Sequence, residues 1–426
     1  MTYQIETNVL HAGYEGEQTT LSGAVPLYRT SAYLFKDTEH AANLFSLKEL
    51  GNIYTRIMNP TQDVLEKRVA SLEGAPAALA LSSGTSAIFN TVINICEQGN
   101  EIVSANNLYG GTYTMFNDIL PKMGIKVHLV DPSDPKNFEA KINMNTRLVY
   151  IETIGNPVLD FTDISAISKI AKKHNLPLAV DSTFTTPYLI NPIEHGADIV
   201  IHSLTKWLGG HGVGIGGIVV DSGKFNWKDP KFTLFTEPES SYHGLRFAHD
   251  LGDLNSVAFA MRMRLVPLRN LGACISPDNA WLFLQGIETL HLRMQRHSEN
   301  AAAVATYLLN HPKVAWVRYP GLVDDPSHTV ACKYLKRGFG GMVVFGVKGS
   351  KKTGIKFINE LKLFSHVANV GDAKSLAIHP ASTTHSQLSD EAQFSSGLKP
   401  ELIRLSIGIE HIDDIIGDLK QSLEKL

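Results

Sequence analysis

Short apolar runs separated by helix-length segments dominate the middle of the chain. Between most runs lie stretches such as 85–96 and 162–175, whose length and patterning predict helices. Continuous apolar strands that alternate with helices indicate a parallel sheet covered on both faces. We therefore expect a doubly wound α/β domain over residues 61–280. The predicted strands are 77–82, 101–105, 126–130, 147–152, 176–181, 198–203 and 217–221.

The two ends of the chain follow other patterns. Residues 1–60 contain turn residues and aromatics with little periodicity, which predicts an extended arm. A helix is expected from Pro60 to a stop at Gly74. Residues 222–275 interrupt the strand–helix alternation. A mostly helical bridge and a smaller C-terminal domain are expected over 281–426, with strands near 314–319, 341–347 and 402–407 and a last helix near 412–426.

The composition excludes several classes of function. A net charge of −3 and a pI near 6.6 give no electrostatic footprint for nucleic acid or an anionic membrane. No apolar run approaches bilayer length, and the N-terminus lacks the pattern of a signal peptide. Cys96, Cys274 and Cys332 are scattered, which argues against a disulfide framework or a structural zinc site. We expect a cytoplasmic protein with no metal and no nucleic-acid or membrane partner.

Residues that could carry chemistry follow the predicted strands. In an open parallel sheet, ligands bind beyond the carboxyl ends of the strands, so these residues meet at one edge. The turn 82–85 precedes a helix, whose free N–H groups and dipole suit a phosphate. Two hydroxyl side chains precede a lysine after the strand 198–203. The candidates at this edge are Gly84, Thr85, Tyr109, Asp181, Ser203, Thr205 and Lys206.

Each of these residues also has an ordinary interpretation. The turn 82–85 could be a simple N-capped helix start, Asp181 a cap, Tyr109 a core ring and Lys206 a solvated charge. Together, however, a phosphate cradle, an aromatic ring, a buried carboxylate and a lysine are what pyridoxal phosphate (PLP) requires. The lysine forms the Schiff base, and the carboxylate keeps the pyridine nitrogen protonated. The combination is therefore far more specific than any member.

The glycine run after the lysine formally matches a dinucleotide fingerprint. Gly212–Gly217 fits GxGxxG, which must follow a strand and open a helix. Here the run leads into the strand-like segment 217–221, with no acidic residue in the expected context. We expect no nicotinamide or flavin site, and interpret the glycines as backbone freedom beside Lys206.

The motifs, in their order along the chain, resemble the Cys/Met-metabolism family of PLP-dependent enzymes. The resemblance spans nearly the whole chain. It implies a type I (aspartate aminotransferase-like) PLP-dependent transferase fold, with a mostly parallel sheet and a smaller C-terminal α/β domain. The motifs are YTRIMNPT (54–61), SSGTSA (82–87), LYGGTY (108–113), ETIGNP (152–157), AVDSTF (179–184), HSLTKWLGGHG (202–212), SLAIHPASTTHS (375–386) and IRLSIGIE (403–410).

The family resemblance implies roles residue by residue. Lys206 would be the Schiff-base lysine, Asp181 the partner of the pyridinium, and Tyr109 a ring that stacks on the cofactor and assists proton transfer. Gly84, Thr85, Ser203 and Thr205 would hold the phosphate, and Tyr54 and Arg56 would reach the phosphate of the neighbouring subunit. Asn156 would bind the ring hydroxyl of the cofactor, while Arg404, Asn369 and Tyr54 would bind the substrate.

Within the family, several features most resemble the O-acetylhomoserine sulfhydrylase branch. They are the arm, the long segment 222–275, the motif at 369–386, and the run 269–273 with Ser276-Pro277. This resemblance implies a transferase that converts O-acetyl-L-homoserine and sulfide to L-homocysteine and acetate. Methionine γ-lyase, cystathionine γ-synthase and O-succinylhomoserine sulfhydrylase activities stay open, as does a non-catalytic PLP carrier. A homodimer is expected as the smallest active unit and a homotetramer as the assembly, with residues 1–60 contributing to the neighbour's site.

Overall fold

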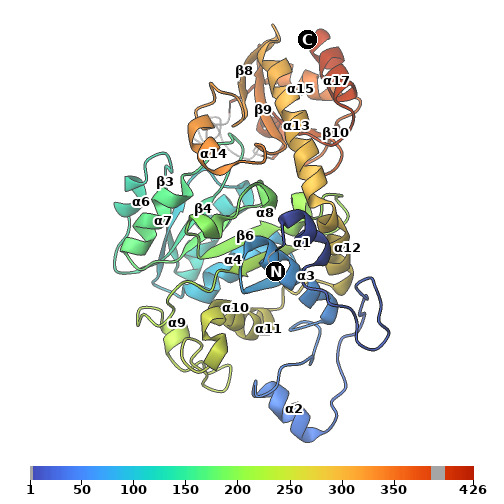
Figure 1. Ribbon diagram of the computed structural model, residues 1–426. Coiled ribbons are helices and arrows are strands. Elements are labelled where there is room, and N and C mark those ends of the chain that lie inside the picture. Colours follow the sequence, from blue (N-terminus) through green and yellow to red (C-terminus); the bar gives the residue numbers. More distant parts are fainter. Residues whose placement is uncertain (1–2, 385–398) are drawn as a thin grey trace.

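The large sheet carries the predicted strands in the order β1-β7-β6-β5-β4-β2-β3. The computed structural model describes residues 3–384 and 399–426 (Figure 1). Each predicted strand is confirmed within one or two residues. Most of them are apolar runs that become buried, whereas β3, at the end of the sheet order, is only partly buried. The strands are β1 (Ala77–Leu81), β2 (Glu101–Ala105), β3 (Lys126–Val130), β4 (Thr146–Glu152), β5 (Leu178–Asp181), β6 (Ile199–Ser203) and β7 (Gly217–Asp221).

One strand departs from the expected parallel arrangement. β2 to β6 run parallel, but β7 is antiparallel to both of its neighbours, β6 and β1. The last residue of β6, Ser203, pairs with the first residue of β7, Gly217. The connection 204–216 therefore turns back at the same edge of the sheet, whereas a parallel return needs a crossover along the whole strand. The lysine lies in this turn.

Helices on either side of the sheet begin and end where the sequence signals them. α3 (Pro60–Glu73) starts after Asn59, whose side chain accepts the N–H of Thr61, and ends at Gly74 with φ of 67°. Gly74 takes this left-handed conformation at little steric cost. α4 (Gly84–Ile95) follows β1 directly. α3 packs on β1 and α12 (Pro277–Glu288), while α4 packs on β6, β7 and α10 (Ala258–Met263).

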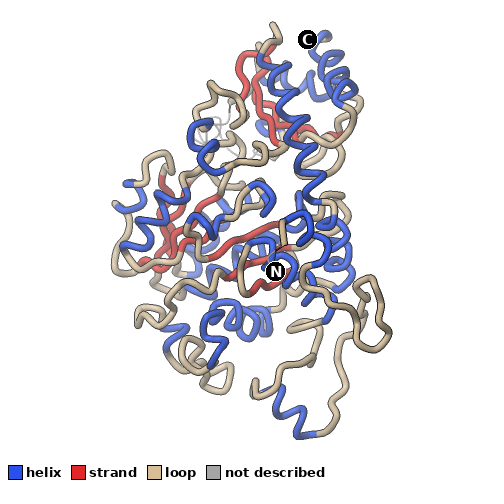
Figure 2. The backbone as a smooth tube through the Cα atoms, viewed as in Figure 1, coloured by secondary structure: helices blue, strands red, loops and turns tan. Residues whose placement is uncertain are grey.

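A second, five-stranded sheet forms the C-terminal unit, in the upper part of Figures 1 and 2. α13 (Leu290–Leu309) leads into it, and its core is a separate cluster that begins at Ala301. Two of its strands escaped the sequence pattern because they are only two and three residues long. The unit contains β8 (Val314–Arg318), β9 (Met342–Val347), β10 (Ser365–His366), β11 (Leu376–Ile378), β12 (Leu402–Ser406), α15 (Lys351–Glu360) and α17 (Ile412–Glu424).

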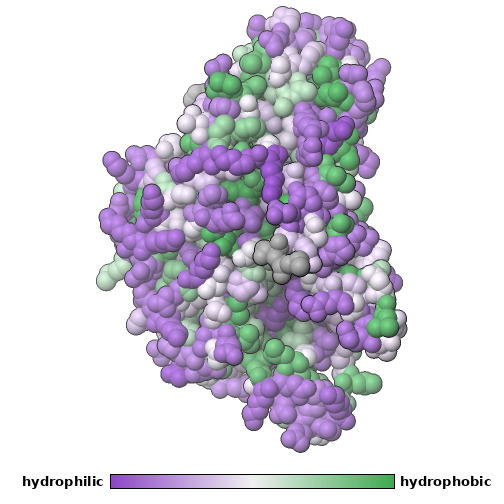
Figure 3. Space-filling view, viewed as in Figure 1, coloured by the Kyte–Doolittle hydropathy of each residue, from purple (hydrophilic) through white to green (hydrophobic). Residues whose placement is uncertain are grey.

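The N-terminal arm is extended only in part. It includes two helices that weak periodicity did not reveal, α1 (Ile5–His11), which packs on α3, and α2 (Thr38–Phe45), which projects from the body (Figure 1). On the face in Figure 3, hydrophobic residues are exposed where the arm meets the body. Leu34 in the arm is 98% exposed. The arm thus presents apolar surface to its surroundings.

The segment 222–275 forms a compact cap of short helices on the large domain. Trp227 lies at its centre, stacked on Phe235 and Phe259 with ring centroids 4.3 and 5.5 Å away. Within this cap, Arg262 forms a salt bridge with Glu239 at 3.1 Å. No helix in the described ranges is both long and apolar enough to cross a membrane.

Candidate active site

Lys206 lies in the turn that follows β6, within the segment Leu204–Leu208. Its Nζ donates a hydrogen bond to Oδ1 of Asn369 at 2.5 Å. Burial, and secondly the nearby guanidinium of Arg404, lower the pKa of Lys206 to about 8. A lysine with this pKa is neutral to a useful extent near physiological pH, which makes its amine a competent nucleophile and base.

The turn around Lys206 is held by residues from distant parts of the chain. Arg293 of α13 donates to the carbonyl oxygens of Trp207 and Leu208 at 2.7 and 3.2 Å. The N–H of Ala373 donates to the carbonyl of Gly210 at 2.8 Å. Arg293 was not among the predicted site residues. The sequence feature that could have revealed it is a positively charged residue at a position of α13 that becomes buried.

The start of α4 makes a tight cradle against the ends of β6 and β7. Ser83 caps the helix by accepting the N–H of Ser86 at 3.0 Å, and the first N–H groups, of Gly84 and Thr85, have no acceptor within the helix. A Cβ on Gly84 would lie 2.7 Å from Cβ of Ser203, and a Cβ on Gly217 would lie 2.1 Å from the carbonyl oxygen of Ser83. Only glycines allow this close approach of a helix N-terminus to the lysine turn.

The two predicted hydroxyl ligands differ in their surroundings. Oγ of Ser203 lies 3.0 Å from the position that a Cβ on Gly84 would take, so it faces the cradle. The hydroxyl of Thr205 donates to the carbonyl of Gly216 at 3.2 Å and accepts the N–H of the same residue at 3.0 Å. To donate to a phosphate, the hydroxyl of Thr205 must first break its hydrogen bond to the carbonyl of Gly216.

Two carboxyl groups end neighbouring strands at this edge. Asp181 ends β5 and pairs in register with Glu152, which ends β4. Burial raises the pKa of Asp181, while hydrogen bonds from Thr183 lower it. The N–H of Tyr109 donates to Oε1 of Glu152 at 2.8 Å. The ring of Tyr109 is half exposed, so it does not pack in the core and is free to contact a ligand. Glu152 lies within the motif ETIGNP and was not among the predicted site residues.

A hydrogen bond joins Arg404, in the second sheet, to Asn156, which follows β4 of the first sheet. Nη1 of Arg404, in β12, donates to Oδ1 of Asn156 at 3.0 Å. The guanidinium is almost fully buried, and burial lowers its pKa to about 10 although Tyr109 raises it. A buried guanidinium is a strong binding site for a carboxylate, since its fork makes two parallel hydrogen bonds.

Tyr54 and Arg56 lie elsewhere on the surface. The guanidinium of Arg56 packs over the ring of Tyr54, 5.3 Å from its centroid, and donates to the carbonyl of Arg269. Across residues 3–384 and 399–426, no hydrogen bond joins this pair to Lys206 or Asp181. The chain therefore brings together ten of the predicted residues and leaves these two apart. The end of the motif 375–386, residues 385 and 386, lies outside the described residues.

The assembled residues fit pyridoxal phosphate. A buried amine of lowered pKa, a carboxylate at a neighbouring strand end, and a helix N-terminus kept open by glycines lie along one sheet edge. They suit the aldehyde, the ring nitrogen and the phosphate of this cofactor, respectively. The Gly212–Gly217 run leads into β7 and not into a helix, which does not fit the dinucleotide fingerprint.

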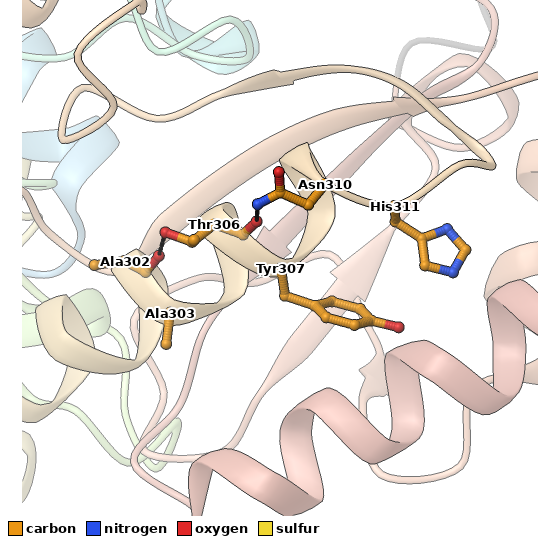
Figure 4. Close-up of a pocket in the computed structure, with 6 residues that line it drawn as sticks. All are labelled: Ala302, Ala303, Thr306, Tyr307, Asn310 and His311. Atoms are coloured by element: carbon orange, nitrogen blue, oxygen red, sulfur yellow. Dashed lines mark hydrogen bonds between the residues drawn. The ribbon is translucent and has the colours of Figure 1, made fainter.

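A surface depression of about 700 Å³ lies on the outer side of α13 (Figure 4). One helix and the turn after it supply its lining, including the rings of Tyr307 and His311, whose centroids are 5.7 Å apart. This depression holds none of the residues at the strand ends, so it is separate from the candidate active site.

Comparisons with known proteins identify the family of the chain. The sequence profile of the Cys/Met metabolism PLP-dependent enzymes matches residues 6–424. The chain is 56% identical to the O-acetyl-L-homoserine sulfhydrylase of Leptospira meyeri, over 100% of this chain and 97% of that protein. It is 51% identical to the homocysteine synthase of Schizosaccharomyces pombe, over 98% of each.

A solved structure is similar along the whole chain. It is a candidate O-acetylhomoserine (thiol)-lyase of Campylobacter jejuni that carries N′-pyridoxyl-lysine-5′-monophosphate at one lysine position. The TM-score is 0.95 at 40% identity, and the match covers 99% of this chain and 100% of that one. This likeness confirms the expected α/β fold with a mostly parallel sheet.

Proposed function

Because the chain belongs to the Cys/Met metabolism family of PLP-dependent enzymes, we propose that it makes L-homocysteine and acetate from O-acetyl-L-homoserine and sulfide. It is a transferase with pyridoxal phosphate as cofactor, and the reaction is a γ-replacement. The observation that carries the proposal is the partly buried amine of Lys206, which is hydrogen-bonded to Asn369 and has its pKa lowered to about 8 by burial and by the charge of Arg404. An amine of this kind attaches the cofactor and then moves protons on the substrate.

Each residue at the sheet edge has a part in this reaction. Bound pyridoxal phosphate supplies an electron sink that stabilises negative charge on the substrate carbon atoms. Asp181 holds the proton on the ring nitrogen, and the N–H groups of Gly84 and Thr85 hold the phosphate, together with Ser203 and Thr205. Asn156 binds the ring hydroxyl.

Lys206 and Tyr109 handle the protons. Nζ of Lys206 would take the proton from Cα of the substrate and assist proton removal at Cβ. The hydroxyl of Tyr109 would give a proton to the acetate as its bond to Cγ breaks. Sulfide then adds at Cγ, and the same groups return the protons in the reverse order.

The substrate carboxylate binds to Arg404. Its guanidinium is buried and already oriented by Asn156, so little rotamer freedom is lost on binding. Asn369, freed from Lys206 when that amine attaches the cofactor, turns its amide to the substrate.

The site is completed by a second copy of the chain. Among the described residues, no hydrogen bond joins Tyr54 or Arg56 to Lys206 or Asp181, and the arm beside them exposes apolar side chains. This supports a homodimer as the smallest active unit, with Tyr54 and Arg56 reaching the phosphate held by the neighbour and Tyr54 its substrate. Two such dimers would make a homotetramer. A cytoplasmic location suits three cysteines that stay free thiols.

Product analysis tests the proposal. The purified protein, loaded with pyridoxal phosphate, is given O-acetyl- or O-succinyl-homoserine with sulfide, cysteine or water as acceptor. Homocysteine formed mainly from the acetyl ester and sulfide is the expected result. A keto acid with ammonia would indicate a γ-lyase, and cystathionine a trans-sulfurating synthase. A yellow protein inert toward every ester would point to a cofactor carrier.

A further inference from the structure

Glu152 is a buried carboxyl group that the roles above leave unused. It ends β4, is 6% exposed, and lies beside Asp181 in the register of β4 and β5. Tyr150, two positions earlier on the same strand, is fully buried and shares its face. A second carboxyl group thus adjoins the one that meets the ring nitrogen.

The carboxyl groups of Glu152 and Asp181 differ in the surroundings that set their pKa values. Burial, and secondly the charge of Asp181, raise the pKa of Glu152 well above its ordinary value. Oδ1 of Asp181 accepts the N–H of Thr183 at 2.9 Å, a bond that favours its ionised form. Burial raises the pKa of Asp181 as well, but several hydrogen bonds oppose that rise, whereas for Glu152 the N–H of Tyr109 opposes it. These directions favour Glu152 as the member of the pair that holds a proton.

The contact that Glu152 makes is with the backbone of Tyr109. Oε1 accepts the N–H of Tyr109 at 2.8 Å, just before the helix α5 (Gly110–Thr114) begins. The ring lies against the start of that helix. A Cβ on Gly111 would be only 2.6 Å from Cε1 of Tyr109. Since the ring is 50% exposed, packing holds only one side of it, and its place depends on the backbone at residue 109.

We propose that Glu152 is a positioning residue for Tyr109, whose ring it fixes in the site by holding the N–H of that residue. The inference rests on the proposed function, in which Tyr109 stacks and transfers protons. This role requires a side chain long enough to reach the N–H of Tyr109 and an oxygen that accepts it. It does not require a negative charge. Gln keeps the length and the acceptor, whereas Asp keeps the acid but is one methylene shorter and misses the N–H.

The test compares E152Q, E152D, Y109F and the double variant E152D/Y109F as holoenzymes. E152Q should keep the kcat and the visible absorption band of the wild type. E152D should lower kcat by about tenfold to a hundredfold, the cost of misplacing a reacting group by roughly 1 Å, with a smaller change in KM. In the Y109F background, E152D should cost much less, because the hydroxyl it misplaces is already gone.

Asp198 supplies the matched control. It precedes β6 at the opposite edge of the sheet, is buried, and its Oδ2 also accepts a backbone N–H, that of Leu178 at 2.9 Å. D198E also changes the length of a buried carboxyl side chain by one methylene, which it adds where E152D removes one, and should leave kcat and the visible band unchanged. Should E152D not fold, E152N has the same short reach and takes its place.

Two results would overturn the proposal. One is an E152Q variant impaired as much as E152D, which would make the acid itself the requirement. The other is an E152D variant with full kcat. A wild-type protein that is yellow but inert would count against the proposed function, and not against the role of Glu152 in holding Tyr109.

Discussion

The amine of Lys206 and the amide of Asn369 are joined by a hydrogen bond of 2.5 Å, although they lie 163 positions apart in the chain. The bond occupies the acceptor of Asn369 while the amine is free, and releases it when the amine attaches the cofactor. We therefore expect N369A to retain pyridoxal phosphate and its visible band. Its KM for O-acetylhomoserine should rise about tenfold or more, the value of a hydrogen bond to a charged group. Equal KM values for N369A and wild type would remove Asn369 from the substrate site.

The lowered pKa of Lys206 predicts how the apoenzyme takes up its cofactor. Only the neutral amine attacks the aldehyde, so the uptake rate should rise with pH and level off above a midpoint near pH 8. An exposed lysine would place this midpoint more than two units higher. Stopped-flow absorbance on the apoenzyme measures it, and a midpoint near 10 in the wild type would contradict the burial of the amine.

Arg404 contributes to that midpoint as a neighbouring positive charge. R404A removes the charge, so the pKa of Lys206 should rise and the midpoint of cofactor uptake should move up by roughly one unit. R404K keeps a positive charge and should leave the midpoint close to that of the wild type. If both variants share one midpoint, the charge of Arg404 does not act on Lys206.

The glycine at the start of α4 predicts a defect specific to the phosphate. G84A puts a methyl group 2.7 Å from Cβ of Ser203, which pushes the helix N-terminus away from the lysine turn. The Kd for pyridoxal phosphate should rise, while pyridoxal, which lacks the phosphate, should bind the variant as it binds the wild type. Gly23 offers the control, since its surroundings are open within 4 Å and G23A introduces no clash. Cofactor titration followed by absorbance distinguishes the variants.

The separation of Arg56 from Lys206 predicts complementation between inactive variants. K206A and R56A homodimers should each be nearly inactive, but after subunit exchange a mixed dimer has one site free of both changes. Equal mixing should recover about a quarter of the wild-type activity, from the statistics of a two-fold interface. No recovery, despite exchange shown by native mass spectrometry, would place Arg56 in the site of its own chain.

Much of the sheet could be predicted because most of its strands are apolar runs that become buried. The run 199–201 in β6, for example, is apolar and fully buried. The direction of β7 was not readable, because an apolar run is the same in either orientation. The pairing of Ser203 with Gly217 decides it. The helix α1 escaped because its packing on α3, and not internal periodicity, defines it. The helix α2 begins at a side-chain cap, that of Asp37, and this start was not among the predicted ones.

The site was predictable where a polar residue ends a strand, and less so where support comes from afar. Asp181 and Lys206 come at or shortly after the ends of apolar runs, and this position predicts their chemical roles. Glu152 has the same signal, a carboxyl after an apolar run, and lacked only a role. Arg293 occupies a buried stripe of α13 between Leu290 and His297, where an isolated charge is the sign of a buried hydrogen-bonding partner.

The bonds from Asn369 and Ala373 to the lysine turn have a consequence for synthesis of the protein. The ribosome synthesises the chain from the N-terminus to the C-terminus, so the strands around Lys206 emerge well before residue 369 has been added. Until then the turn lacks its bond at Gly210, and the amine lacks both its amide partner and Arg404. Chains that stop short of the last strand therefore carry the lysine without Asn369 or Arg404, and we expect them to hold the cofactor less firmly than the completed chain.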